Sequence, residues 1–264
     1  MSFFFVLFIL IFINCSLTNA QKIFIVTSSD NYGKINLKKS FYIGYANPSF
    51  GIIYDLKLPK KYYLITPDGK KEKITLFRHT FFDKALNIKR IGYKAVITPL
   101  YKGDYNICII GDYSLTSQGK IIQDFTKVVF HVEEKKKWDN LCGFDLEIKP
   151  YTRPYGLKET AIFWGQVLYN GKPLKNGMVE TEKLNYFSFS LNNLPRDSNN
   201  EVNYPLLKKE TKISKNGFFV VSFEEPGWWV VSIKIKRGFK NFGNKLYPFE
   251  IRTNLWLYIF PKSL

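Results

Sequence analysis

Short strand-like segments separated by turn dipeptides recur along most of this chain, and this pattern limits its fold most strongly. Asp68-Gly69, Asn170-Gly171 and Asn216-Gly217 each stand between such segments. These dipeptides accept the positive φ angles of tight hairpin turns, so three β-hairpins are predicted. Because no amphipathic helix of useful length interrupts the pattern, the sequence predicts an all-β fold of antiparallel β-sandwiches.

The best domain boundary lies near residue 140, where a strand runs into a charged stretch that contains Lys135, Lys136 and Lys137. We expect one β-sandwich over residues 21–140, of the immunoglobulin-like kind, and a second over residues 141–264. Residues 195–205 are polar and rich in turn formers, which favours a long loop in the second domain.

Two local patterns refine this prediction. Tyr105 precedes an apolar strand in the manner of a tyrosine corner, in which the hydroxyl bonds back to the main chain. In residues 228–236 apolar residues alternate with Ser232, Lys234 and Lys236. This alternation predicts an antiparallel surface strand with one buried and one wetted face.

Residues 1–20 have the features of a cleavable secretion signal. An unbroken apolar run over residues 3–13 is followed by polar residues, with Thr18 and Ala20 at the small-residue positions before a cut. We expect cleavage after Ala20 and a periplasmic or cell-envelope location. Two alternatives stay open: acylation of Cys15 as a lipoprotein, and an uncleaved anchor, although a membrane span needs about 20 apolar residues.

The charge balance is strongly basic. The chain has 39 Lys and Arg against 22 Asp and Glu, a formal net charge of +17, and none of these charges falls in the signal. Such a field favours acidic partners such as anionic envelope polymers and lipid headgroups. Nucleic acid is not expected as a partner of an exported chain, and no transmembrane span is expected after cleavage. A compositional bias towards Lys, Ile, Phe, Tyr and Asn would also give this charge.

Cleavage after Ala20 would leave Cys108 and Cys142 as the two thiols of the chain. An oxidising compartment would allow a disulfide between them, with a stabilisation of roughly 3–4 kcal/mol. Two buried free cysteines are the alternative.

The sequence contains no catalytic motif that predicts an enzyme. His79 and His131 are the only histidines, so neither a paired-histidine metal motif nor a serine triad can be assembled. Among the aromatic residues, Trp229 is expected in the core. Its neighbour Trp228 would then face the other way and is the better candidate for contact with a partner.

Three segments carry a resemblance to a known family: WDNLCGFDLEIKPYTRPYGL, FWGQVLYNGKPLKNGMVETEKLN and KNGFFVVSFEEPGWWVVSIK. They resemble the domain of unknown function family 4198, bacterial periplasmic proteins of which some are described as nickel or cobalt uptake components. The resemblance implies two β-domains, the second similar to prealbumin-like or carboxypeptidase-regulatory sandwiches. It also implies that the stretch PYTRPY fixes the chain path between the domains, with Arg153 free for an ion pair or a partner.

The resemblance further implies nickel or cobalt as cofactors. Relatives carry histidines at positions that match Lys22 or Ile23, Asn47, and Asp124 with Phe125 in this chain, which therefore lacks the imidazoles that suit these metals. His79, His131 and Asp124 are the remaining candidate ligands.

Two functions follow from the sequence, with an uncharacterised hydrolase as a third hypothesis. The first is a non-enzymatic periplasmic binding or accessory protein that serves an envelope transport component, associated with nickel or cobalt uptake as the resemblance implies. The second is a structural or adhesive β-sandwich module that binds anionic envelope polymers.

Overall fold

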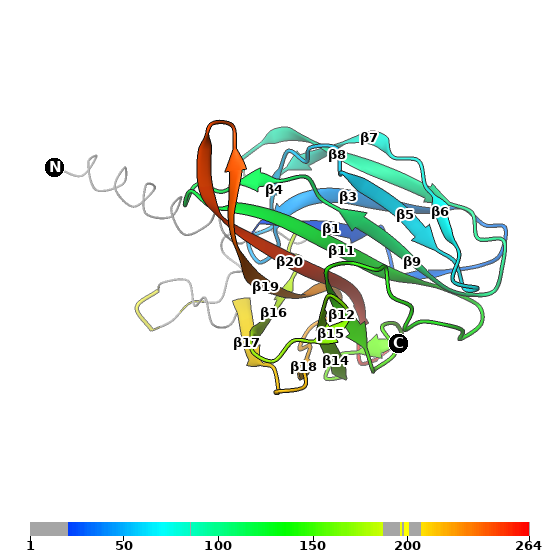
Figure 1. Ribbon diagram of the computed structural model, residues 1–264. Coiled ribbons are helices and arrows are strands. Elements are labelled where there is room, and N and C mark those ends of the chain that lie inside the picture. Colours follow the sequence, from blue (N-terminus) through cyan, green and yellow to red (C-terminus); the bar gives the residue numbers. More distant parts are fainter. Residues whose placement is uncertain (1–20, 85, 187–195, 197, 201–206, 264) are drawn as a thin grey trace.

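The computed structural model describes residues 21–84, 86–186, 196, 198–200 and 207–263 (Figure 1). The expected signal and most of the polar stretch over residues 195–205 lie outside the described residues. Every regular element in the described part is a β-strand, which confirms the all-β prediction. That part contains no helix of the length and apolar character needed to cross a membrane.

The first sheet comes entirely from the N-terminal half. Its strands run antiparallel in the order β1, β3, β8, β7, and β4 pairs with β3. Their bounds are Lys22–Val26 (β1), Lys39–Asn47 (β3), Ile52–Tyr54 (β4), Phe77–Asp83 (β7) and Ile88–Ile97 (β8). Phe41 and Ile43 are buried while Tyr42 between them is partly exposed, the two-residue period of a strand with one core face.

The second sheet is the largest and takes strands from both halves of the chain. Its order is β17, β16, β19, β20, β11, β9, β5, β6, and the short strands β2, β10 and β13 pair with β11 or β20. The main bounds are Lys61–Ile65 (β5), Lys71–Lys73 (β6), Gly103–Ile110 (β9), Ile121–Val132 (β11), Met178–Lys183 (β16), Lys208–Lys212 (β17), Gly227–Phe242 (β19) and Lys245–Phe260 (β20); the short strands are Tyr32–Gly33 (β2), Ser114–Leu115 (β10) and Leu157–Lys158 (β13).

Most of this second sheet is antiparallel, but β11 and β20 run parallel. Ile121 to Val128 lie opposite Phe249 to Trp256. Asn254 donates a side-chain hydrogen bond to the Thr126 hydroxyl at 3.1 Å, which helps to fix this register.

The third sheet comes from the C-terminal half. It contains β12 (Leu146–Pro150), β14 (Ile162–Tyr169), β15 (Lys172–Pro173) and β18 (Phe218–Ser222), all antiparallel, with β14 in the middle.

Two apolar cores lie on opposite faces of the large sheet. The alternating side chains of β11 show this: Val128 and Phe130 join a core with the first sheet, whereas Phe125 joins a core with the third sheet. In β20, Trp256 belongs to the first core and Leu255 to the second. The molecule is therefore a pair of β-sandwiches that share their middle sheet, in agreement with the predicted β-sandwich class. The prealbumin-like type of the second sandwich stays a prediction.

The shared sheet crosses the expected domain boundary near residue 140. The first core, whose other members come mainly from residues 21–140, also contains Leu184, Trp228, Val230 and Trp256. The division at that residue stays a prediction.

The predicted wetted face of residues 228–236 is wrong at Ser232, which is buried, and is confirmed at Lys234 and Lys236, which are exposed. The strand is antiparallel to both its neighbours, as predicted. From Trp228 to Ile233 every residue of β19 is buried, and exposed positions begin at Lys234. The reason is that the strand lies inside the middle layer, so each of its faces meets a core.

The turn dipeptides behave in two ways. Asp68-Gly69 and Asn170-Gly171 close hairpins, as predicted, between β5 and β6 and between β14 and β15. Asn216-Gly217 does not, because β17 pairs with β16 and β18 pairs with β14. This turn instead carries the chain from one sheet to the next, and the Val167 amide of β14 donates to the Gly217 carbonyl at 2.9 Å.

The tyrosine corner is confirmed. The Tyr105 hydroxyl donates to the Tyr101 carbonyl at 2.8 Å and accepts from the Tyr101 amide at 2.9 Å.

Candidate functional site

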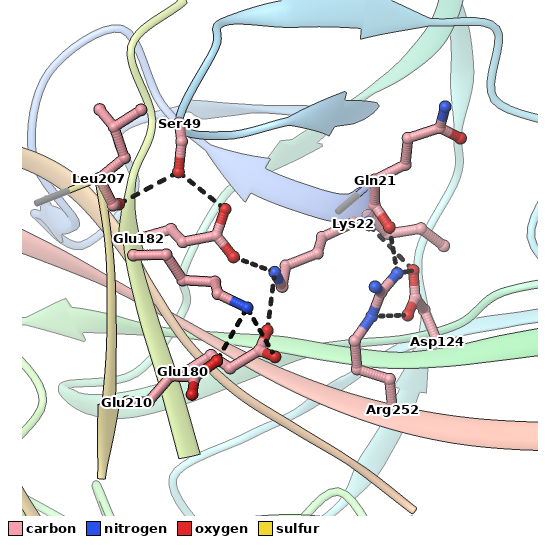
Figure 2. A network of polar contacts seen from close by, with 11 residues as sticks. Gln21, Lys22, Ser49, Asp124, Glu180, Glu182, Leu207, Glu210 and Arg252 are labelled. Atoms are coloured by element: carbon pink, nitrogen blue, oxygen red, sulfur yellow. Dashed lines mark hydrogen bonds and ion pairs between the residues drawn. The ribbon is translucent and has the colours of Figure 1, made fainter. Parts of the chain in front are cut away.

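A cluster of buried charged side chains lies where the first strand meets the large sheet (Figure 2). Lys22 comes from the first residue of β1, Glu180 and Glu182 from β16, Asp124 from β11 and Arg252 from β20. Of these five, Lys22, Glu182, Asp124 and Arg252 have side chains at most 3% exposed. We call these five residues the charge cluster.

Lys22 forms one half of the charge cluster. Its ammonium group pairs with Glu182 and lies 3.5 Å from a Glu180 oxygen. The second Glu182 oxygen accepts a hydrogen bond from the Ser49 hydroxyl at 2.9 Å. Both oxygens of this buried carboxylate therefore have partners, as a charge away from water requires.

Glu180 links this half to the edge of the sheet. Its other oxygen accepts from Lys208 of β17 at 3.2 Å, and Lys208 also pairs with Glu210 at 3.0 Å. Burial would raise the pKa of Glu180, but the ammonium groups of Lys22 and Lys208 outweigh it and lower the pKa to about 2. The carboxylate is therefore ionised over the whole physiological pH range.

Arg252 and Asp124 form the other half. The Arg252 guanidinium donates to both Asp124 oxygens, at 2.7 and 3.0 Å, in the two-pronged geometry that suits this pair. The same guanidinium donates to the Gln21 carbonyl. The Ile23 amide donates to Asp124 at 3.1 Å. The start of β1 is thus tied by main-chain and side-chain bonds to β11 and β20.

Tyr45 lies beside this pair. Its burial, and then the negative charge of Asp124, raise the pKa of the phenol to about 12. A small cavity of about 80 Å³ opens next to it, lined in part by Asp55, Asp112 and Asp124. Tyr45 is neutral at physiological pH and can act only as a hydrogen-bonding group there.

The charge cluster does not fit a nickel or cobalt site. Its positions include Lys22 and Asp124, where the family resemblance places histidines, and the structure brings both of them together with Ile23 at the start of β1. A protonated lysine has no lone pair for a metal, and the Asp124 oxygens already accept from Arg252 and Ile23. Among the described residues, no group of three or more His, Cys, Asp or Glu could hold a metal ion.

The other candidate ligands lie apart from the charge cluster and from each other. Asp124 and His131 are on the same strand, seven residues apart, which corresponds to roughly 23 Å. His79 lies on β7 of the first sheet, in ring contact with Tyr42 and Phe81. Burial, and then the positive charge of Lys94, lower the pKa of His79.

His131 belongs to a small polar cluster of its own. Its Nδ1 lies 2.7 Å from an Asp104 oxygen, and its ring stacks on Tyr155 with 4.1 Å between centroids. The other Asp104 oxygen accepts from the Tyr155 hydroxyl at 3.1 Å and from the Lys136 amide at 2.8 Å. Asp104 is fully buried and has both oxygens engaged, so this group holds β9, β11 and the PYTRPY stretch together.

Cys108 of β9 and Cys142 are joined by a disulfide, with their Cα atoms 5.9 Å apart. The turn at Cys142 is fixed further by the buried Glu147 carboxylate. It accepts from the Cys142, Gly143 and Phe144 amides and pairs with Lys127 at 2.6 Å.

The two expected partner contacts differ in the structure. Trp228 is only 3% exposed, and its indole nitrogen donates to the Ser29 carbonyl at 3.0 Å. The expectation that it faces a partner is wrong, because the second face of β19 is covered by the first core. Trp229 is buried as predicted. Arg153 is exposed, and its guanidinium lies 5.1 Å from the Tyr155 ring centroid. Its availability to a partner stays a prediction.

Sequence reasoning did not find Arg252, Glu180 or Glu182. A signal existed for Arg252, because a lone arginine in the apolar run around NLWLYIF must find a carboxylate if the strand is buried. Its partner Asp124 is 128 residues away, and only the parallel pairing of β11 with β20 identifies it.

Comparisons with known proteins give a family match and, among solved structures, a weak likeness. A crystal structure of a mutant Salmonella alpha-2-macroglobulin is 14% identical, with a TM-score of 0.25, over 92% of this chain and 15% of that one. This chain thus spans a small part of that protein, and the likeness is too weak to inform its fold. No curated protein matches the chain. Residues 19–237 match the profile of the family described as Domain of unknown function (DUF4198), and the chain therefore belongs to that family.

Proposed function

We propose that this protein is an exported, non-catalytic binding protein of the cell envelope that recognises anionic envelope polymers by charge. After loss of residues 1–20 it would work in the periplasm or at the envelope. The observation that supports this proposal best is the run of exposed lysines over residues 135–137, at one end of the large sheet. The charge cluster is buried and paired internally, and its cations Lys22 and Arg252 argue against a metal role there.

A role in nickel or cobalt uptake fits these residues less well. A metal ion at the charge cluster would have to displace a buried ammonium or guanidinium group from its carboxylate, and breaking a buried pair costs about 3–5 kcal/mol. The net charge of +17 would add long-range repulsion of cations.

The surface that suits an anionic polymer lies at one end of the large sheet. Lys135, Lys136 and Lys137 are exposed in the loop that follows β11. This loop reaches the turn between β5 and β6, since the Asn140 side chain donates to the Thr66 carbonyl at 3.5 Å. The Asp104 amide of β9 also donates to the Lys136 carbonyl, at 2.9 Å. The exposed edge strand β6, which carries Lys71 and Lys73, leads away from that same turn. We call these five lysines the basic end.

Binding of the chain from Gln21 to a soluble polyanion, such as a sulfated dextran or a polyuronate, tests the proposal. We expect binding in 0.15 M salt that weakens as salt rises, because ions screen exposed charges. A triple variant K135Q/K136Q/K137Q should bind at least tenfold more weakly.

The control triple variant K172Q/K175Q/K215Q removes the same charge from exposed positions around β15 and the turn before β18. It should lose less than threefold. Equal losses in the two variants would show that the basic end has no special role, and no binding by the unmodified chain would refute polymer recognition.

Calorimetric titration with nickel and cobalt gives the second test. We expect no binding at micromolar metal, with the protein's urea midpoint unchanged by either ion, since a ligand that binds only the folded state would raise it. Binding at that concentration would restore the metal-uptake role.

A further inference from the structure

The last two long strands extend beyond the sheet that contains them. β19 and β20 pair along their whole length up to the turn at Gly243. The neighbouring strand β16 pairs with β19 only through Ser232, and β11 pairs with β20 only from Phe249 onward. The distal part is a two-stranded ribbon that projects from the body of the molecule, coloured orange and red in Figure 1. We call residues 234–248 the hairpin tip.

The hairpin tip is basic and has no acidic residue. Its charged residues are Lys234, Lys236, Arg237, Lys240 and Lys245. The nearest carboxylate along the strand, Glu250, is buried and pairs with Lys120.

Two large apolar side chains among these charges are exposed to solvent. Phe239 is 68% exposed and Leu246 is 63% exposed. Phe239 lies opposite Pro248, and Leu246 lies opposite Asn241. Residues directly opposite one another, and residues two apart on a strand, share a face, so Phe239, Leu246 and Pro248 are all on one side of the ribbon.

The other side of the ribbon faces the body of the protein. The Lys240 ammonium lies 4.1 Å from the Tyr113 ring centroid and 5.6 Å from that of Phe249. The Arg237 guanidinium lies 4.9 Å from the Tyr169 ring. A bulge between Lys236 and Phe239 shifts the register of the ribbon there, with Gly238 at a φ of +85°. One side of the ribbon therefore contacts the body of the protein, while its apolar side is exposed to solvent.

We propose that the hairpin tip docks on an anionic lipid surface. Lipid headgroups would meet Lys234 and Lys236, which are exposed on the same side of the ribbon. Phe239 and Leu246 would enter the boundary between headgroups and acyl chains. This combination of a basic rim with exposed apolar side chains is the chemistry of interfacial membrane contact. A polyanion in water offers the lysines a partner but offers Phe239 and Leu246 none. The contact goes beyond the polymer binding proposed above and uses a different surface.

Co-sedimentation of the chain from Gln21 with vesicles tests this proposal. One set contains phosphatidylglycerol mixed with phosphatidylcholine, and the other contains phosphatidylcholine alone. We expect binding to the anionic vesicles at least tenfold stronger than to the neutral ones. The variant F239S/L246S should lose at least tenfold of the anionic-vesicle binding while it keeps the circular dichroism and urea midpoint of the unmodified chain.

A matched control removes two equally exposed leucines elsewhere. Leu58 and Leu100 are 54% and 63% exposed and lie outside the hairpin tip, and L58S/L100S should change vesicle binding less than twofold. A charge variant, K234Q/K236Q, removes the two exposed lysines on the same side of the ribbon as Phe239 and should also bind anionic vesicles several-fold more weakly.

Anionic-vesicle binding by F239S/L246S at the level of the unmodified chain would overturn the proposal. Equal binding of the unmodified chain to both vesicle types would overturn it too. An equal loss of sulfated-dextran binding in F239S/L246S would mark the tip as a polymer contact instead. Dextran binding and vesicle binding are measured in separate experiments. A failure of polymer recognition would therefore not change the interpretation of the vesicle result.

Discussion

Glu180 shows how single residues hold the start of this chain. Its two oxygens face Lys22 and Lys208, one from the first strand and one from the edge of the large sheet. Its side chain is 16% exposed, so the ion pairs are little screened by water. Removal of the negative charge would leave the Lys22 ammonium with Glu182 as its remaining carboxylate partner in the charge cluster.

The variant E180Q should therefore lose stability in a pH-dependent way. The folded pKa of Glu180 is about 2 against an ordinary value of 4.5, so its stabilisation is full above about pH 4.5 and is lost as the pH falls through about 2. At pH 6 we expect the free energy of unfolding of E180Q to be roughly 3 kcal/mol lower than that of the unmodified chain.

Urea unfolding from pH 7 to pH 2 measures this difference, which should shrink below pH 4.5. The control E72Q changes an exposed glutamate on β6 and should cost less than about 0.5 kcal/mol at any pH. A constant difference between E180Q and the unmodified chain would show that the ion pairs are not responsible.

Residue roles that depend on local sequence could be predicted, and those that depend on distant partners could not. The Tyr105 corner is closed by a residue four positions away, so the local pattern suffices. His131 gave no such signal, since its partner Asp104 is 27 residues away on another strand. The charge cluster joins Lys22 to Glu182 across 160 residues, and no sequence period connects them.

At the scale of elements, the disulfide between Cys108 and Cys142 connects β9 to the segment that leads into the third sheet. Its sequence separation of 34 means that it constrains a long loop in the unfolded chain. Reduction should therefore lower the free energy of unfolding by about 3–4 kcal/mol on the chain-entropy estimate.

Urea unfolding with and without dithiothreitol checks this expectation. The variant C108A/C142A should unfold at the same urea concentration in both conditions, which separates reduction from other effects of the reagent. Detection of two free thiols in the denatured, non-reduced protein would contradict the bond.

Elements with turn signals at their ends were predictable, whereas those defined by layering were not. Asn170-Gly171 identifies its hairpin because both residues adopt positive φ, at 48° and 74°. The alternation after Trp228 predicted a wetted face for β19, but from Trp228 to Ile233 the strand lies between two cores and is buried on both faces. A surface strand and a middle-layer strand differ in what packs on them, and that information is spread over the rest of the chain.

On the scale of the whole molecule, the two sandwiches depend on one shared sheet. β11 comes from the N-terminal half and pairs along eight residues with β20 near the C-terminus. The first core needs Trp228, Val230 and Trp256 to close it. The composition predicted enough apolar material for two β-sandwiches, but the sharing of a layer could not be read from it.

A fragment of residues 21–140 should therefore not fold alone. It would expose the Phe125 face of β11, which packs on the third sheet, and would lack the C-terminal members of the first core. We expect the nuclear magnetic resonance spectrum of an unfolded or aggregated chain. The chain from Gln21 to Leu264, prepared in the same way, is the control. A dispersed spectrum and a cooperative urea transition of the fragment would instead establish residue 140 as the boundary of an independent domain.

The charge cluster has a consequence for the order of events in folding, because Lys22 lies on β1 and Arg252 lies on β20. A chain that emerges one residue at a time cannot complete this arrangement until its final strand has arrived. Until then, the core that contains the apolar residues of β1 lacks Trp256 of β20. Completion of the charge cluster therefore requires strands from both halves of the described chain, β1 and β11 from one and β16 and β20 from the other.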